Sequence, residues 1–104
     1  MHARASMIEG SRDRLEDGIA RLEHDTFEEL QHIDGFSGIL GLVDRETSRT
    51  LVVTLWESEA AMLESEATAN TLRRAAADEL GTRREPKVDR YECVLCEVRT
   101  PVHA

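Results

Sequence analysis

The clearest hydrophobic pattern is a helical stripe in the first half of the chain. Small or apolar side chains recur every third or fourth residue, with charged residues between them, which places them on one side of a helix. Ser11 can cap the start of this helix, and Asp34 and Gly35 end it. His24 and His32 fall off the stripe, so we expect both in solvent. The stripe consists of Leu15, Ile19, Leu22, Thr26, Leu30 and Ile33.

A second helix is predicted from Ser58, a good N-cap, to Leu80, with Gly81 as its stop. Its inward stripe contains one polar member, Ser65. The stripe consists of Met62, Ser65, Ala69, Leu72, Ala76 and Leu80.

Four further segments have the composition of β-strands, at residues 2–8, 36–44, 49–57 and 87–98. Their side chains alternate between two faces. In the first strand, Arg4, Ser6 and Ile8 share one face. The third strand is apolar on both faces, which indicates a strand covered on both sides. Gly38 and Gly41 leave space on the second strand for a close neighbour.

The element order is β-α-β-β-α-β, which predicts an α+β fold with a ferredoxin-like subunit. An antiparallel sheet then carries both helices on one face, and the other face is bare. Because that bare face is apolar, we expect a second copy to cover it in a homodimer. Residues 1–98 form one domain in this interpretation, and residues 99–104 form a C-terminal tail.

The amino-acid composition limits the classes of partner that we expect for this chain. The 104 residues carry 13 basic and 21 acidic side chains, a net charge of −8, which argues against a nucleic-acid partner. No apolar run is long enough to span a membrane. The N-terminus lacks the apolar stretch of a signal peptide, so the expected compartment is the cytoplasm.

Cys93 and Cys96 form the motif CVLC, which fits either a metal or redox pair or two ordinary thiols. A zinc site needs four ligands, and the chain has no second such pair. In a strand the two α-carbons would lie roughly 10 Å apart, too far for a disulfide. We therefore expect no metal and two free thiols, buried or half-buried.

The stretch GFSGILGLVDRETSRTLVVTLWESEAAM, followed by a helix and VDRYE, resembles the antibiotic-biosynthesis monooxygenase (ABM) domains of the dimeric α/β-barrel superfamily. The resemblance covers residues 2–98. It implies a dimer whose two sheets form a barrel, with a pocket between helices and sheet in each subunit. Some ABM members oxidise polycyclic aromatic phenols with O2 and use no metal or flavin, so no cofactor is expected.

The resemblance also suggests substrate-binding candidates. Trp56 matches a pocket tryptophan of the family by motif, whereas Tyr91 and Arg4 match by residue type alone. Ser65 stands nine residues after Trp56, where the heme-degrading branch has an iron-binding histidine. A serine hydroxyl is a poor substitute for imidazole on iron, so heme degradation is not expected. Asn70, the only asparagine, is not in a matching motif.

Each candidate also has an ordinary structural interpretation. Trp56 can be a core-edge anchor whose indole N–H donates to a carbonyl. Tyr91 can be a packed side chain without a role in binding. Arg4 can be a charge at the surface or at an interface. No general base is evident, and Glu92 is more simply explained as an ion-pair partner of Arg90 or of an arginine in a second subunit.

Two functions therefore stay open. One is a cofactor-independent monooxygenase for an aromatic or quinone-like small molecule. The other is a non-catalytic dimer that binds a small molecule or has a structural role. An oxygenase needs an open cavity beside Trp56 with two or more polar groups, whereas a structural dimer fills that space with side chains.

Overall fold

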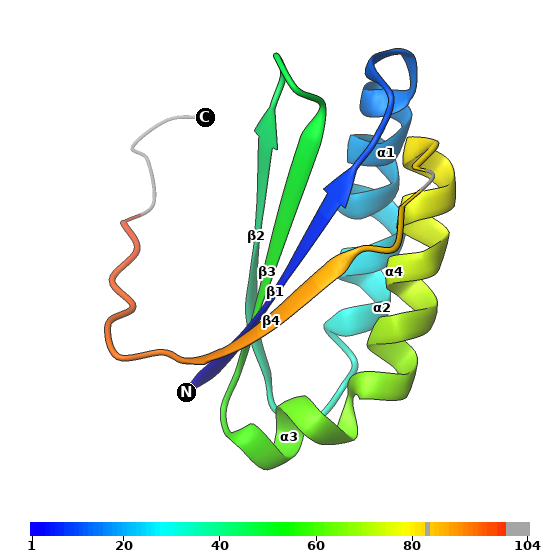
Figure 1. The fold of residues 1–104 in the computed structure, drawn as a ribbon. Coiled ribbons are helices and arrows are strands. Elements are labelled where there is room, and N and C mark those ends of the chain that lie inside the picture. The colour runs from blue at the N-terminus through cyan, green and yellow to red at the C-terminus, as the bar shows by residue number, and fades with distance from the viewer. Residues whose placement is uncertain (83, 100–104) are drawn as a thin grey trace.

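The computed structural model describes residues 1–82 and 84–99, which form a two-layer α+β structure (Figure 1). A four-stranded antiparallel sheet makes one layer, and the helices cover one of its faces. The order across the sheet is β2-β3-β1-β4, which confirms the predicted ferredoxin-like fold. The strands are β1 (His2–Glu9), β2 (Phe36–Asp44), β3 (Arg49–Trp56) and β4 (Lys87–Glu92).

The first predicted helix is present, but its winding changes along its length. The stripe residues lie on its inner side, with Leu15, Thr26 and Leu30 buried. Ser11 does not cap it by its side chain as expected, because its hydroxyl donates to the Leu80 carbonyl at 3.4 Å. The segments are a 3-10 turn (Arg12–Arg14), α1 (Leu15–Arg21), the π-helix η2 (Leu22–Thr26) and α2 (Phe27–Leu30).

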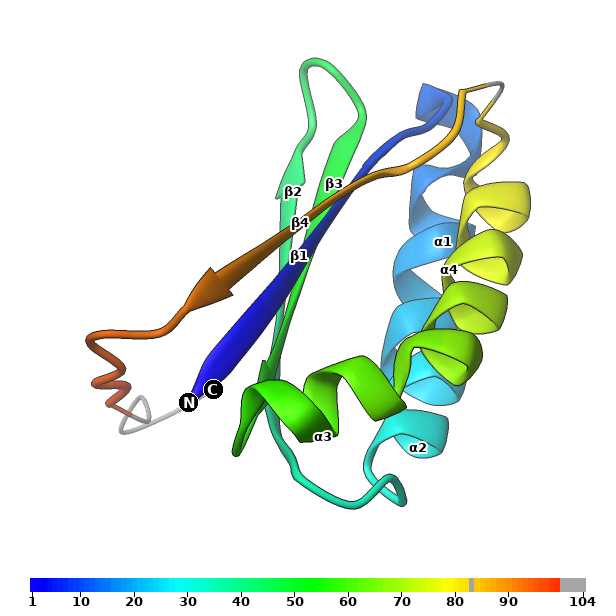
Figure 2. The same ribbon diagram turned by 60° about the horizontal axis from the view of Figure 1, so that its bottom comes forward.

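The second predicted helix is divided at Ser65 into α3 (Glu59–Glu64) and α4 (Glu66–Leu80), which meet at an angle in Figure 2. The prediction of one continuous helix is wrong here. The Ser65 hydroxyl donates to the Met62 carbonyl at 2.7 Å, a local bond of the kind that bends helices. The predicted ends are confirmed: Ser58 accepts from the Ala61 N–H, and Gly81 has a left-handed φ of 73°.

Strand β4 ends at Glu92, so the predicted strand to residue 98 is six residues too long. Its last pair is Glu92 with His2, the first residue of its partner strand β1. The Cys93 N–H makes the last bond, to the Met1 carbonyl at 2.8 Å. Both thiols are free, but Cys96 is exposed and not buried as expected, since it lies beyond the sheet. Most of the predicted tail, residues 100–104, lies outside the described residues.

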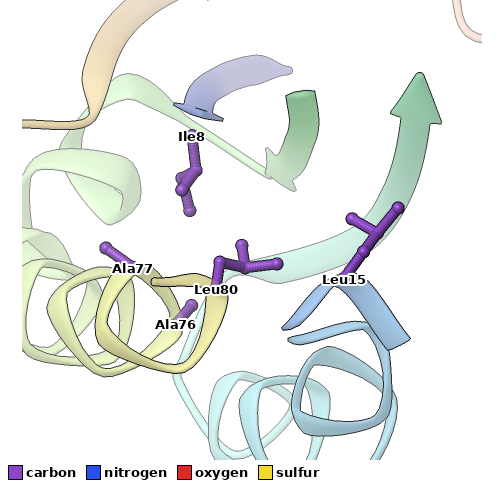
Figure 3. Packing of buried hydrophobic residues seen from close by; sticks show 5 residues of the cluster. All are labelled: Ile8, Leu15, Ala76, Ala77 and Leu80. Carbon is purple, nitrogen blue, oxygen red and sulfur yellow. The ribbon is translucent and has the colours of Figure 1, made fainter. Parts of the chain in front are cut away.

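The hydrophobic core lies between the sheet and the helices. Trp56, Leu30 and Met62 form one cluster, packed near α3. Where α1 crosses α4 the contact is close: a β-carbon added to Gly18 would lie 2.1 Å from Leu80 Cδ2. A second cluster there is shown in Figure 3 and consists of Ile8, Leu15, Ala76, Ala77 and Leu80.

The opposite face of the sheet has no covering layer among the described residues (Figure 1). Large apolar side chains on it are exposed, with Leu40 at 43% and Leu42 at 52%. The register places them beside Val53 and Leu51 of β3, which are only half-buried. This is the bare apolar face that the alternation predicted. No described helix is long and apolar enough to cross a membrane.

Candidate functional site

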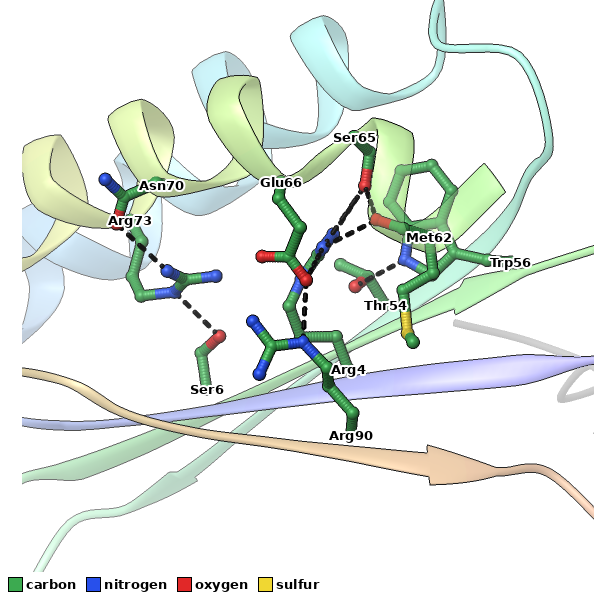
Figure 4. Close-up of polar contacts among 10 residues, drawn as sticks. All are labelled: Arg4, Ser6, Thr54, Trp56, Met62, Ser65, Glu66, Asn70, Arg73 and Arg90. Atoms are coloured by element: carbon green, nitrogen blue, oxygen red, sulfur yellow. Dashed lines mark hydrogen bonds and ion pairs between the residues drawn. The ribbon is translucent and has the colours of Figure 1, made fainter. Parts of the chain in front are cut away.

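Arg4, Trp56 and Ser65 lie together between the sheet and α3 (Figure 4). Arg4 is buried, at 2% exposure, and its guanidinium carbon stands 5.3 Å from the Trp56 ring centroid, within cation–π range. Its Nη1 and Nη2 donate to Ser65 Oγ at 3.1 and 2.7 Å, and Nη1 also donates to the Met62 carbonyl at 3.3 Å. Three of the four residues singled out by sequence are therefore neighbours.

Trp56 is fully buried in this arrangement. Its ring meets Phe36 edge-on, with centroids 5.5 Å apart, and Arg4 covers its ring face. The indole N–H donates to Thr54 Oγ1 at 2.9 Å, a side-chain acceptor and not the carbonyl expected for a core anchor. Trp56 is therefore packed as a core residue, with the Arg4 guanidinium over its ring face.

Two more arginines and a glutamate complete a polar cluster around Arg4 (Figure 4). Arg90 of β4 donates from Nε to Glu66 Oε1 at 2.7 Å, and Arg4 Nη1 lies 3.5 Å from the same oxygen. Arg73 of α4 donates from Nε to Ser6 Oγ at 3.0 Å. Arg90 thus pairs with Glu66 and not with Glu92, and an arginine of a second subunit stays the other predicted partner of Glu92.

The cluster carries an excess of positive charge. Three guanidinium groups surround one carboxylate, in a chain whose net charge is −8. Burial lowers the pKa of Arg4 and of Arg73, and neighbouring arginines lower each pKa further. The hydrogen bond from Arg90 lowers the pKa of Glu66. Since arginine stays protonated near neutral pH, all four groups are charged there.

A small space adjoins this cluster and is called the inner cavity. Its volume is about 40 Å³, room for a few atoms. Its accessible surface is almost entirely apolar. It is lined by Arg4, Ser6, Ile8, Leu22, Thr26, Leu30, Val52, Thr54, Ala69, Leu72, Arg73 and Ala76.

A larger space, the outer groove, opens between β2 and the first helical segments. Its volume is about 580 Å³, within the range of small-molecule sites. Gly41 leaves part of it open, because a β-carbon there would have no atom within 4 Å. Its lining is apolar apart from one carboxylate and consists of Ile19, Leu22, Glu23, Phe27, Ile39, Gly41, Val43 and Val52.

The groove and the cavity share two lining residues, Leu22 and Val52. Leu22 begins the π-helix η2, a winding that is rare in proteins and frequent at functional sites. Both spaces are therefore lined in part by the π-helical segment η2.

No known protein-family model matches the chain. Among curated proteins, it is 33% identical over 104 residues to the uncharacterised protein Rv2558 of Mycobacterium tuberculosis, covering 99% of this chain and 43% of that protein. It is 29% identical over 92 residues to Rv2557 of the same organism, covering 88% of this chain and 40% of the relative. The chain thus spans about two fifths of the length of the curated relatives it matches.

Solved structures share the fold at low sequence identity. A monooxygenase from the gene ActVA-Orf6 of Streptomyces coelicolor, in complex with nanaomycin D, matches with a TM-score of 0.74 and 14% identity over 95% of this chain and 92% of that chain. A dimeric ferredoxin-like protein from an uncultured marine organism matches with a TM-score of 0.66 and 14% identity, covering 95% and 92% of the two chains. The chain has the ABM fold.

Within the ABM fold, Tyr91 lies apart from the other three residues predicted by sequence. It pairs with Ala3 on the bare face of the sheet and is 55% exposed. Arg90, its neighbour in β4, pairs with Arg4 on the helix-covered face instead. Alternation along β4 contained this signal, but sequence alone did not align β4 with β1.

Arg73, Glu66 and the outer groove were not identified from the sequence. Arg73 stands one position beyond the stripe residue Leu72 and reads as a solvated helix residue. Only the packing of α4 over β1 brings it to Ser6. Within residues 1–82 and 84–99, no group of three or more His, Cys, Asp or Glu side chains is placed to hold a metal ion.

Proposed function

We propose that this ABM-fold protein binds a flat aromatic or quinone-like small molecule in the outer groove. The observation that carries the proposal is an apolar opening of about 580 Å³ whose floor is left free by Gly41. Phe27 and Ile39 offer apolar surface to a ring, and such walls are typical of small-molecule sites. The complex of the S. coelicolor monooxygenase with nanaomycin D supports a ligand of this kind.

Cofactor-independent oxygenation is the chemistry we propose to test at this groove. Glu23 is the ionisable side chain among the described residues that line it, and it can take a proton from a phenolic hydroxyl group or from a benzylic CH2 group. The resulting anion donates electrons to O2. A CH2 group and O2 then give a carbonyl group and water. The alternative is binding without turnover, and the lining favours it, since Trp56 does not line the groove and Glu23 is its single polar side chain among the described residues.

Binding can be measured through Trp56, because its emission is the only tryptophan signal of the chain. Naphthols, anthrones and quinones are titrated, and we expect saturable quenching by energy transfer. Gly41→Leu should fill the groove and abolish quenching while the fold is kept, since the new side chain meets open space. Thr68→Leu adds the same side chain at an exposed site outside the groove and should bind as the wild type does.

Oxygen uptake separates the two forms of the proposal. An oxygenase consumes one O2 per ligand oxidised, and Glu23→Gln should stop uptake while ligand still binds. Binding without oxygen uptake in the wild type leaves the non-catalytic form. If no ligand quenches Trp56, or if Gly41→Leu binds normally, the groove is not the site.

We also propose that the protein is a homodimer closed through the bare face of the sheet. Leu40, Leu42, Val53 and Leu55 form a contiguous apolar surface there, which a monomer seldom exposes. The marine structural neighbour is a dimeric ferredoxin-like protein, which supports the same arrangement. Light scattering at micromolar concentration should give twice the chain mass of 11.7 kDa, and a monomer mass would refute this assembly.

A further inference from the structure

We propose that Cys93 and Cys96 form a reversible dithiol–disulfide pair that exchanges with small-molecule disulfides. Their CVLC spacing is that of known redox pairs. The pair lies beyond the end of β4 and includes no residue of the outer groove, so it does not depend on the proposed function. Three observations carry it: the path of the chain after β4, the position of the Cys93 sulfur and the exposure of Cys96.

The path of the chain removes the geometric objection to a disulfide. Two cysteines three positions apart in a strand are held roughly 10 Å from each other, too far for the bond. Strand β4 ends at Glu92, however, so the CVLC segment lies wholly outside the sheet. Figures 1 and 2 show this segment leaving the sheet on the side away from the helices. Strand geometry therefore does not hold the two thiols apart.

The Cys93 side chain shows that the segment turns back on itself. Its thiol donates to the Leu95 carbonyl oxygen at 3.6 Å, a contact that a straight strand does not allow. In a trans peptide that oxygen lies about 2.8 Å from the next α-carbon, which here belongs to Cys96. Cys93 Sγ is therefore at most roughly 6.5 Å from the Cys96 α-carbon. Rotation of the Cys96 side chain and a small backbone shift bring the two sulfurs into bonding distance.

The backbone around the pair is held at one end only. The Cys93 N–H donates to the Met1 carbonyl at 2.8 Å, which fixes Cys93 at the end of the sheet. Beyond it, no backbone-to-backbone hydrogen bond joins residues 94–99 to another described residue. Cys96 can therefore approach Cys93 without breaking the sheet.

Exposure gives the two sulfurs different roles. Cys96 is exposed, whereas Cys93 is half-buried and its S–H is engaged with Leu95. Reaction of a thiol with a disulfide requires access to the sulfur. Cys96 is therefore the residue that attacks the small disulfide, and Cys93 is the residue that closes the ring.

A small disulfide, RSSR, is the oxidant in this exchange. The Cys96 thiolate attacks one of its sulfurs, which breaks the S–S bond, forms a mixed disulfide and releases one RS−. The Cys93 thiolate then attacks Cys96 Sγ, which forms the protein disulfide and releases the second RS−. The two thiol protons end on the two leaving groups, and two electrons pass from the protein to RSSR.

The charge around the pair favours a cationic disulfide. Glu92 and Glu97 flank the two cysteines directly, with Arg99 two positions further on, in a chain whose net charge is −8. Such a surface attracts a cation and repels an anion, an effect that salt screens. Cystamine, a disulfide with two amino groups, is therefore the probe.

The test treats the reduced chain with cystamine and follows it by mass spectrometry and thiol titration. We expect a product that is lighter by two hydrogen atoms, with both thiols lost and no bond between chains. The equilibrium with cystamine and cysteamine measures how readily the ring closes. We expect closure to be at least roughly tenfold more favourable in the native protein than in urea, because the folded segment brings Cys93 towards Cys96.

Two matched variants test the roles of the sulfurs. Cys93→Ser should stop at the mixed disulfide on Cys96. Cys96→Ser should form its mixed disulfide at least roughly fivefold more slowly, because the remaining thiol is half-buried. Thermal melts check that both variants are folded, and equal rates in the two would contradict the assignment of roles.

Equal ring closure in the native and the urea-unfolded chain would overturn the proposal, because the folded segment would then contribute nothing. Mixed disulfides on both cysteines without ring closure, or disulfides between chains, would do the same. Thiols that react only after unfolding would show that the native assembly covers them, and would also refute it. Ligand titrations of the outer groove are a separate measurement, so failure here leaves the proposed function in place.

Discussion

The two faces of the sheet use the same strands in opposite ways. On the helix-covered face, Trp56, Ile8 and Arg4 are almost completely buried. On the bare face, Leu40, Leu42 and Tyr91 expose about half of their surface. Hydrophobicity alone would place polar side chains on the exposed face of the sheet. Here the buried face holds the arginine cluster, and the exposed face is largely apolar.

This contrast shows that hydrophobicity alone does not identify the core side of a strand. The covered face tolerates charge because its arginines are paired with Ser65, Glu66 and Ser6. The bare face is apolar without a covering layer among the described residues of a single chain, and larger exposed apolar patches in other proteins mark interaction sites. The predictions below test the difference between the two faces.

The largest effect is expected at adjacent residues that point to opposite faces. Trp56→Ala removes a fully buried ring and should lower the free energy of unfolding by about 3–5 kcal/mol. Leu55→Ala removes a half-buried side chain and should cost about 1 kcal/mol in the monomer. Urea unfolding at low protein concentration measures both. Equal losses would mean that the faces are equally buried in solution.

Leu40→Lys tests whether a second copy covers the bare face. A lysine at this exposed position leaves the monomer's unfolding free energy within about 0.5 kcal/mol, because surface changes are usually small. In a dimer it puts a charge into an apolar interface, so light scattering should give a monomer mass. Leu63→Lys, at an exposed site on α3, is the control and should stay dimeric. A dimeric Leu40→Lys variant would move the interface elsewhere.

A smaller effect on stability is expected at Thr50 and Thr54, two threonines of β3 on the helix-covered face. Thr50 is buried, and its hydroxyl has no hydrogen-bond partner among the described residues. Thr50→Val should stabilise the protein by about 1 kcal/mol, because it removes an unsatisfied polar group. Thr54→Val should destabilise it by about 1 kcal/mol, because it leaves the Trp56 indole N–H unpaired. Thermal denaturation shows whether the two changes have opposite signs.

The smallest effect concerns acid stability. The pKa of Glu66 is lowered below its usual value of 4.5, chiefly by Arg90, so folding gains stability above that pH. The gain is lost as the pH falls from about 4.5 through the lowered pKa of the folded state. Glu66→Gln should therefore be less stable than the wild type at pH 7, and the difference should shrink as the pH falls below 4.5. Urea unfolding across this range measures the difference, and a constant difference at all pH values would refute it.

Much of the fold could be predicted because it depends on local patterns. Alternation in residues 2–8 and 49–57 gave the two faces, and the Leu15 to Ile33 stripe gave the inner side of the first helix. Two errors have different causes, one local and one that depends on strand pairing. Ser65 divides the second helix by bonding to Met62, and β4 stops where β1 begins.

The candidate site was only partly predictable, because it joins residues that are distant in sequence. Arg4 and Ser65 are 61 positions apart, and Arg73 and Ser6 are 67 apart. Hydrophobic periodicity says nothing about which polar groups meet across the two layers. Tyr91 is the opposite case. Its residue type suits the site, but it lies on the bare face of the sheet, whereas Trp56 lies on the helix-covered face.

The sequence by itself determined the order of elements, the apolar bare face and the approach of a helix to Trp56, because side-chain periodicity is a property of the local chain. Tertiary structure decided that Arg4 covers Trp56 and that Gly41 opens a groove. These features depend on strand register and on how α4 packs against the sheet. Both are set by the packing of the whole domain.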